Sequence, residues 1–317
     1  MLKKEEQTEL YSPRPSLWEG IWVIDKPPGR TSHQVLQKIR TLSGHRKMGH
    51  IGTLDPLATG VLPVCVGWAT KLIPFIAVSP KVYRAQMVLG RSTDTQDVSG
   101  QVLQVSPEPP PWPEAIVKVC QSFVGTQRQI PPVYSALKFQ GQPLYRWARR
   151  GKPVVKPSRE ITIESIRILE IDGEVVDFEV TCSSGTYIRT LCADIGEQLG
   201  CGAYLNTLQR TRSGPFTLEQ AVPWEILEQA PVRGGQEVWR LPLDFILGKY
   251  PQVRVEEAWR QKIRQGCWIE PEEALSEWPA VQPGEPVCVI SPENQLLAIY
   301  HLPGDLKREL KPLRVLI

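Results

Sequence analysis

The sequence lacks the arrangements through which proteins usually hold metals, disulfide frameworks or organic cofactors. Its seven cysteines are an odd number, and no two of them form a Cys-x-x-Cys pair. This argues against a zinc site and a disulfide framework and favours reduced thiols. The four histidines include no metal-binding pair, and neither a Walker A loop nor a dinucleotide-binding glycine motif occurs. We therefore expect a protein that needs no metal and no cofactor.

Long apolar runs and a large charge excess are also missing. The most apolar segment, residues 61–78, is interrupted by Pro63, Lys71 and Pro74, which makes it too broken to span a membrane. The N-terminal residues have no apolar core of a signal peptide. We expect a cytoplasmic protein with no membrane partner, in which residues 1–18 form a disordered tail. The net charge of only +3 directs attention to local clusters of charge.

One twelve-residue stretch, Gly49 to Gly60 with the sequence GHIGTLDPLATG, stands out. Its glycines and proline are unsuited to a helix or a central strand, so it is predicted to form an ordered loop. Pro56 restricts Asp55 to extended conformations. The apolar residues around Asp55 would fix the loop to a core. The stretch therefore predicts a single carboxylate on a tightly held turn, which is either a structural Asp-Pro turn or part of a functional site.

The rest of the chain has the pattern of an α+β protein. Val35, Leu36, Ile39 and Leu42 follow helical spacing after a possible cap at Thr31 or Ser32, with Gly44 as the stop. Strands are predicted at residues 20–27, 61–67, 82–89, 161–171 and 175–182, the last two as a hairpin. A mixed, mainly antiparallel sheet flanked by helices is therefore expected. Beyond residue 250, short strands predict a small β-barrel.

The segment from Thr126 to Arg159 is the most basic part of the chain. It contains eight basic residues and no acidic one, and four aromatic residues are interleaved with them. A solvated charged face is the ordinary interpretation of such a segment. The exclusion of acids and the aromatic rings favour a surface that binds phosphates and stacks on bases.

Six sequence blocks together resemble one family, the TruB-type tRNA pseudouridine synthases. The loop around Asp55, continued by VLPVCVGWATK, is similar to the active-site motif of that family. The other five blocks also match and occur in the family's order, and the resemblance covers roughly residues 20 to 220. They are VIDKPPGRTSHQV, VYRAQMVLGRSTDTQDVSG, IPPVYSALKFQGQPLYRWARRG, SSGTYIRTL and LQRTRSGPF.

The resemblance implies a role for three residues in the reaction. It gives Asp55 as the catalytic carboxylate, Arg189 as its cationic partner, and Tyr83 as the aromatic that packs on the target uracil and handles the C5 proton. A cation beside Asp55 would be expected to lower the pKa of its carboxyl group. Without the resemblance, Arg189 would be interpreted as a surface arginine at a helix start, and Tyr83 as a core tyrosine.

The resemblance also implies residues that bind the substrate. It gives His50 as a wedge in the folded RNA loop, although a hydrogen-bonded loop histidine is an equal alternative. Lys26 and Leu208 would help to shape the pocket. The basic segment, about residues 126–159, would be an inserted RNA-binding loop, with its contacts made by Arg146, Arg149, Arg150, Lys152 and Tyr145.

The resemblance predicts a catalytic domain with the pseudouridine synthase fold at residues 19–248 and a PUA-like RNA-binding barrel at residues 249–317. The expected reaction converts the T-loop uridine of tRNA (position 55) to pseudouridine, by C1′–N1 cleavage, base rotation and C1′–C5 rejoining. A monomer that acts without guide RNA is expected. The alternatives are a guide-RNA-dependent enzyme of the dyskerin type, a non-catalytic tRNA-binding or tRNA-folding module, and, more remotely, a metabolic enzyme with an aspartyl intermediate.

Overall fold

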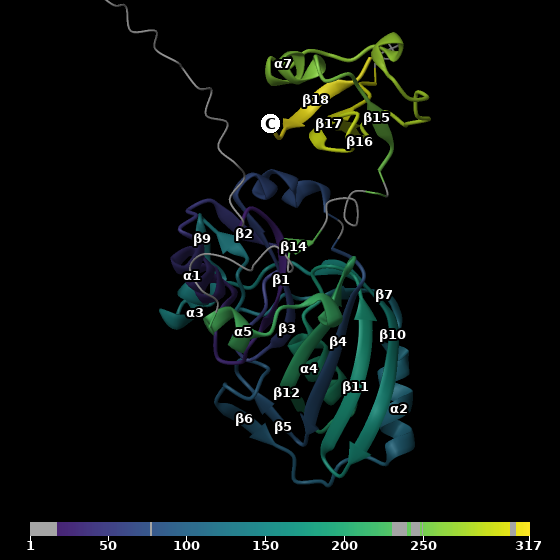
Figure 1. Cartoon of the computed structure of the whole chain (residues 1–317). Coiled ribbons are helices and arrows are strands. Elements are labelled where there is room, and N and C mark those ends of the chain that lie inside the picture. The colour runs from purple at the N-terminus through teal and green to yellow at the C-terminus, as the bar shows by residue number, and fades with distance from the viewer. Residues whose placement is uncertain (1–17, 77, 230–239, 242–247, 249, 305–308) are drawn as a thin grey trace, which may run out of the picture.

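The computed structural model describes residues 18–76, 78–229, 240–241, 248, 250–304 and 309–317. They form a large α+β body and a smaller sheet at the C-terminal end (Figure 1). Residues 1–17 of the predicted tail lie outside the described residues. Trp18, the last residue of that predicted tail, is buried and stacks on Trp22 with 4.9 Å between ring centroids. No helix in the described parts of the chain is long and apolar enough to cross a membrane.

A ten-stranded sheet forms the centre of the body. Its main order is β14-β1-β3-β12-β4-β11-β10-β7, with β2 paired to β3 and β13 paired to β12. Only the contact between β12 and β3 is parallel, so the prediction of a mixed, mainly antiparallel sheet is confirmed. The strands are β1 Gly20–Lys26, β2 Met48–His50, β3 Thr59–Val66, β4 Lys81–Leu89, β7 Gly125–Gln129, β10 Arg159–Asp172, β11 Val175–Cys182, β12 Ala203–Ser213, β13 Phe216–Thr217 and β14 Arg240–Leu241.

Helices lie against this sheet and bury a large apolar cluster with it. They are α1 Ser32–Ser43, α2 Pro113–Ser122, α4 Ile188–Gln198 and α5 Trp224–Gln229, with 3₁₀ helices at η1 Gly67–Phe75 and η2 Leu218–Gln220. A second apolar cluster packs η1 against β1 and β3. Helix α1 begins and ends as its sequence predicts. Thr31 and Gln34 form a capping box, and Gly44 closes the helix with a φ of 71°. The apolar residues predicted for its inner face are all buried.

The predicted hairpin from residue 161 to 182 is present and is longer than expected. Strand β10 begins at Arg159 and pairs with β11 on one side and with β7 on the other. The polar turn after β4 contains a short pair that the sequence did not reveal, β5 Arg91–Thr93 with β6 Val102–Val105. This pair places the turn between them, with Asp97, next to β12 through a bridge to Leu205.

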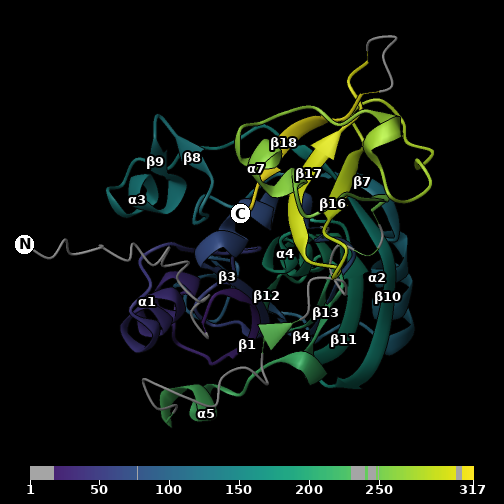
Figure 2. The same ribbon diagram turned by 45° about the horizontal axis from the view of Figure 1, so that its top comes forward.

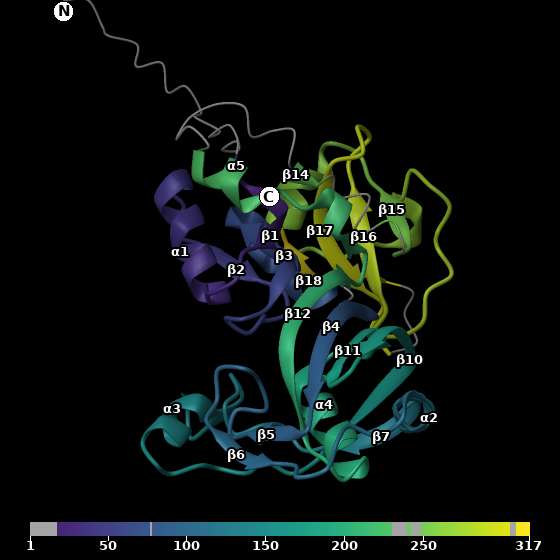
Figure 3. The ribbon, with the colours of Figure 1, turned by 90° about the horizontal axis from the view of Figure 1, so that it is seen from below.

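After β7 in sequence, the basic segment protrudes from the side of the body away from that strand (Figure 2). It contains the two-residue strands β8 Lys138–Phe139 and β9 Gln142–Pro143, and the short helix α3 Leu144–Arg149. Figures 2 and 3 show this unit well apart from α2, which lies against the opposite edge of the body. Its own small core is formed by Trp147, whose ring meets Phe139 edge-on at 5.8 Å and whose Nε1 donates to the Phe139 carbonyl.

The C-terminal part is a four-stranded sheet with the order β15-β16-β17-β18. Its elements are β15 Gln252–Arg254, β16 Pro286–Ile290, β17 Leu296–His301, β18 Lys311–Val315, α7 Trp259–Arg264 and the 3₁₀ turn η4 Pro271–Glu273. In the described residues β15 and β18 are edge strands without a pairing between them, so the prediction of a closed barrel is not confirmed. Cys288 and Ile299 share an apolar cluster with β1 and β3, which joins this sheet to the body.

Candidate active site

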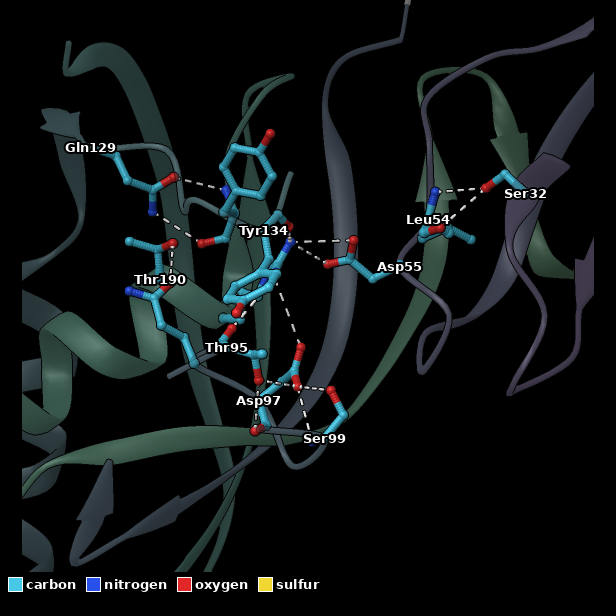
Figure 4. A network of polar contacts seen from close by, with 12 residues as sticks. Ser32, Leu54, Asp55, Thr95, Asp97, Ser99, Gln129, Tyr134 and Thr190 are labelled. Carbon is cyan, nitrogen blue, oxygen red and sulfur yellow. Dashed lines mark hydrogen bonds and ion pairs between the residues drawn. The ribbon is translucent and has the colours of Figure 1, made fainter. Parts of the chain in front are cut away.

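The loop that carries Asp55 connects β2 to β3 and is fixed at several points. The Ser32 hydroxyl accepts from the Leu54 backbone N–H at 2.9 Å and donates to the Leu54 carbonyl at 3.2 Å (Figure 4). On the other side of Asp55, the Pro56 carbonyl accepts from Gly29 N–H at 2.8 Å. A Cβ at Gly60 would collide with the backbone of Arg210, and its φ of +93° also favours glycine. These contacts hold the loop rigidly, so that it fixes the position of one carboxylate, as predicted.

Asp55 forms an ion pair with Arg189, which lies in the first turn of α4. The Nη2 of Arg189 is 3.1 Å from Oδ2 and 3.4 Å from Oδ1 of Asp55. The same nitrogen donates to the Tyr134 carbonyl at 2.7 Å. The Arg189 side chain is only 4% exposed, so a cation that the sequence alone would place on the surface is buried against a specific carboxylate.

A second acidic residue, Asp97, completes the surroundings of the guanidinium. Its Oδ2 lies 3.9 Å from Nη1 of Arg189. Its Oδ1 accepts from the Thr95 hydroxyl at 2.7 Å, the Ser99 hydroxyl at 2.5 Å and the Ser99 N–H at 3.0 Å (Figure 4). The sequence indicated no role for Asp97. The available signal was the density of hydroxyl and carboxyl groups between Ser92 and Ser99.

The start of α4 is held by side chains from two other segments, which explains why Arg189 stays in place. Gln129, at the end of β7, accepts from the Tyr187 N–H at 2.8 Å and donates to the Tyr187 carbonyl at 3.0 Å (Figure 4). The Thr190 hydroxyl donates to Oε1 of Gln96 at 2.8 Å. The helix has no N-cap side chain of its own, and these contacts replace one.

The pKa of Asp55 differs from the expectation. Burial raises the pKa of Asp55 above its ordinary value, and the neighbouring Arg189 and Lys26 offset only part of that rise. The expectation of a lowered pKa was therefore wrong, because removing the carboxylate from water outweighs its ion pair.

Lys26 is fully buried at the end of β1. Its ammonium donates to the carbonyls of Arg30, Pro27 and Pro56, at 2.6, 2.8 and 3.2 Å. Burial lowers the pKa of Lys26 to about 8, and the charge of Asp55 opposes this shift. Lys26 therefore helps to hold the turn next to Asp55.

Tyr83 is buried on β4, directly opposite a residue on β12 that the sequence did not reveal as part of the site, Arg210. Arg210 is fully buried on β12 and donates to the carbonyls of Val61 at 2.7 Å and Gly52 at 2.9 Å. Burial raises the pKa of Tyr83, so the hydroxyl is a neutral phenol near pH 7. Arg210 belongs to the LQRTRSGPF block, but the sequence does not indicate that an arginine in this strand is completely buried.

His50 and Leu208 lie close to this group. The His50 ring is largely buried, and its Nδ1 has no hydrogen-bond partner among the described residues. Burial and the nearby charge of Arg210 lower the pKa of His50, which favours a neutral imidazole. Leu208 is buried on β12 opposite Ala85, and its carbonyl accepts from the Thr59 hydroxyl at 3.4 Å.

The predicted RNA-contacting side chains of the basic segment belong to a separate surface. Tyr145 is half-buried below the guanidinium of Arg149, at 5.8 Å. Only the backbone of Tyr134 connects this segment directly to Arg189. The four predicted cations all lie on α3 or just after it, at the protein surface, namely Arg146, Arg149, Arg150 and Lys152.

The described residues contain no group of three or more His, Cys, Asp or Glu side chains that could hold a metal ion. All seven cysteines are free thiols. The site therefore offers a carboxylate, a phenol and buried cations as its chemically active groups.

A half-buried carboxylate on a rigid loop is paired with a buried arginine in this mixed sheet, and comparisons with known proteins identify the class of protein as a pseudouridine synthase. The model of the TruB family pseudouridylate synthase N-terminal domain matches residues 40–188, and that of the tRNA pseudouridylate synthase B C-terminal domain matches residues 189–244. The chain belongs to the TruB family of pseudouridine synthases.

Curated relatives match over most of the chain. A protein of Syntrophotalea carbinolica named tRNA pseudouridine synthase B is 42% identical over 90% of this chain and 92% of its own. A protein of the same name from Bacillus subtilis is 40% identical over 94% of this chain and 97% of its own. Among solved structures, a Cbf5-Nop10-Gar1 complex contains a chain with a TM-score of 0.71 and 26% identity, covering 96% of this chain and 88% of that chain. The mixed α+β fold is thus that of the pseudouridine synthases.

Proposed function

We propose that this enzyme converts the T-loop uridine of tRNA (position 55) to pseudouridine, with Asp55 as the catalytic carboxylate. The observation that carries the proposal is the ion pair of half-buried Asp55 with buried Arg189, with Oδ2 and Nη2 3.1 Å apart on segments that are 134 residues apart in sequence. The relatives named tRNA pseudouridine synthase B support tRNA as the substrate.

The reaction breaks the bond between ribose C1′ and uracil N1, turns the base, and joins C1′ to C5. No group is lost and nothing is oxidised, because the proton on C5 is released and N1 gains one. Asp55 either attacks covalently or stabilises the positive charge that develops on the sugar or base. Both roles require the ionised carboxylate, and Arg189 favours that form and fixes its orientation.

Tyr83 is proposed to pack on the target uracil and to handle the C5 proton through its hydroxyl. Arg210 lies opposite Tyr83 on the neighbouring strand, and its charge opposes the rise in the pKa of that hydroxyl. Lys26 and Leu208 would shape the pocket, and His50 would fill the space left in the RNA loop once the base has been flipped out. Flipping costs a few kcal/mol, which contacts of the RNA with the basic segment would offset. The contacts would come from Arg146, Arg149, Arg150, Lys152 and the Tyr145 ring.

The proposal includes the organisation of the chain. Residues 19–248 would be the catalytic domain, with the RNA-binding insertion at 126–159. Residues 249–317 would form a PUA-like module that touches tRNA away from the T-loop. We propose a monomer working in the cytoplasm without guide RNA, because the surface cations of the insertion supply an RNA-binding surface of its own. The chief alternative is an enzyme that works inside a ribonucleoprotein, such as the archaeal box H/ACA sRNP Nop10-Cbf5 complex among the similar solved structures.

The deciding experiment incubates the purified chain with an unmodified tRNA transcript and maps pseudouridine. Pseudouridine at the T-loop position, without added RNA or protein, is the expected result. Modification only in the presence of a second RNA would support the ribonucleoprotein alternative. Binding of the transcript without modification would instead identify a tRNA-binding module.

A further inference from the structure

We propose that Lys81, with Arg210 and Ser213 beside it, forms a binding site for a phosphodiester group of the RNA next to the target nucleotide. The inference rests on the proposed function, because it needs an RNA substrate. It concerns residues that lie outside the ion pair of Asp55 and Arg189.

The three residues lie side by side on the face of the sheet that carries Tyr83. Lys81 and Tyr83 are two residues apart on β4, so their side chains point to the same face. On the neighbouring strand β12, Ser213 pairs with Lys81 and Arg210 pairs with Tyr83. All four side chains are buried. An RNA whose target base rests on Tyr83 would therefore bring its backbone close to Lys81.

The two cations converge on the loop that carries Asp55. A Cβ placed on Gly52 would lie 3.2 Å from Nη1 of Arg210 and 3.3 Å from Nζ of Lys81. Gly52 has a φ of +74° and no side chain, so the space between the two nitrogens is not filled by this residue. The loop thus leaves room for both cations three residues before Asp55.

The group has hydrogen-bond donors without acceptors. Arg210 Nη1 and Ser213 Oγ are buried and have no hydrogen-bond partner in the described part of the chain. Buried donors are almost always paired, and leaving one unpaired costs about 1–3 kcal/mol. An anion with several oxygen atoms would supply the missing acceptors.

Cations surround Lys81. The charges of Arg210 and Arg159 lower its pKa and the Cys182 thiol opposes them, and no carboxylate is among the groups that shift it. Lys26, by contrast, has the carboxylate of Asp55 nearby. Burial with like charges lowers the pKa of Lys81 to about 8, which leaves the ammonium mostly protonated at pH 7. Buried cations without a carboxylate are costly for stability, and a phosphate is the counter-charge that arrives with RNA.

The test uses the full chain and the variant Lys81→Met, which keeps the apolar stem and removes the charge. The affinity for an unmodified T-arm RNA hairpin is measured over a range of KCl concentrations. We expect the variant to bind about 10-fold more weakly and its log–log salt slope to be less steep by about 0.7. Its melting temperature should not fall, because an uncompensated buried cation has been removed.

The matched control is Lys118→Met, an exposed residue of α2, the helix that lies next to β10 (Figure 3). It should keep the wild-type affinity and salt slope. A second measurement compares the melting temperatures of wild type and Lys81→Met with and without inorganic phosphate. Stabilisation of the wild type alone by phosphate would show that the site accepts the anion.

Two results would overturn the inference. Wild-type affinity and salt slope in Lys81→Met would mean that the donors face only ordered water. Stabilisation by inorganic phosphate without any change in RNA binding would mean that the site takes a free anion and not RNA. The proposed function is tested separately by the wild type on the same hairpin. If the wild type forms pseudouridine but Lys81→Met binds normally, only this inference fails.

Discussion

The loop around Asp55 and the basic segment at residues 126–159 both place charge where RNA is proposed to bind, yet they are built in opposite ways. The charges around Asp55 are buried and come from segments far apart in sequence, such as Arg189 and Asp97. The cations of the basic segment are neighbours in sequence and lie at the surface of a short helix. Burial fixes the positions of charged side chains and makes the energy of each charge depend strongly on its partner. Exposed charges interact weakly one by one, so their effect depends on how many there are. The first region suits chemistry and the second suits binding.

The largest effect should follow Asp55→Asn. We expect the rate of pseudouridine formation to fall by at least about a thousandfold, because the amide can neither attack nor stabilise positive charge. Affinity for tRNA should stay close to wild type, since the basic segment is untouched. Single-turnover kinetics and a binding titration measure the two effects. Asp172→Asn, at the exposed end of β10, is the control, and substantial turnover by Asp55→Asn would remove Asp55 from its role.

Arg189→Lys should be nearly as damaging although it preserves the charge. The guanidinium contacts Asp55, the Tyr134 carbonyl and the Thr95 carbonyl from two nitrogens, and a lysine cannot reproduce that planar geometry. We expect kcat/KM to fall on the order of 100-fold and the melting temperature to drop. Arg167→Lys, whose guanidinium pairs with Glu179 on the hairpin, should change neither. Normal kinetics in Arg189→Lys would show that charge alone is sufficient.

Neutralising the basic segment should affect binding and spare chemistry. With Arg146, Arg149, Arg150 and Lys152 all replaced by Gln, the salt slope of tRNA binding should become less steep by roughly 0.7 for each phosphate that is no longer neutralised. The rate at saturating tRNA should change little. Folding should be unaffected, because these four side chains lie at the surface. An unchanged salt slope would identify the segment as a solvated face.

The two aromatic rings of α3 sharpen this prediction. Tyr145→Leu should lower affinity without changing the salt slope, because stacking releases few counterions. The sequence suggests the same role for Trp147, but its ring packs on Phe139 inside the unit. Trp147→Ala should therefore loosen the segment, which hydrogen exchange of residues 138–149 would detect.

The smallest effects concern pH. Because burial raises the pKa of Asp55, kcat/KM should fall on the acid side at a higher pH than an ordinary aspartate would give. Deprotonation of Lys26, with a pKa of about 8, removes one of its three N–H donors and the cation near Asp55. We expect a decline of a few-fold above pH 8, absent in Lys26→Met. An acid limit at the ordinary aspartate value, with the fold intact by circular dichroism, would contradict the assignment to Asp55.

The sequence by itself determined the local elements and the position of the loop. Caps and apolar spacing specify α1, and alternation specifies β11, because these patterns act over a few residues. The glycines and Pro56 identify the Asp55 loop for the same reason. The resemblance of six blocks indicated the family and singled out Tyr83 and Arg189 as site residues. It did not show which groups these two side chains contact.

Only the tertiary structure decided which charges meet and how deeply they are buried. The sequence does not identify Arg210 as a site residue. Its complete burial depends on hydrogen bonds to the carbonyls of Gly52 and Val61, which are distant in sequence. The raised pKa of Asp55 was missed because desolvation depends on every segment packed around the carboxyl group. The open C-terminal sheet differs from the expected barrel because short strands do not specify how a sheet closes. Local patterns specify elements, and long-range packing sets the electrostatics that the chemistry uses.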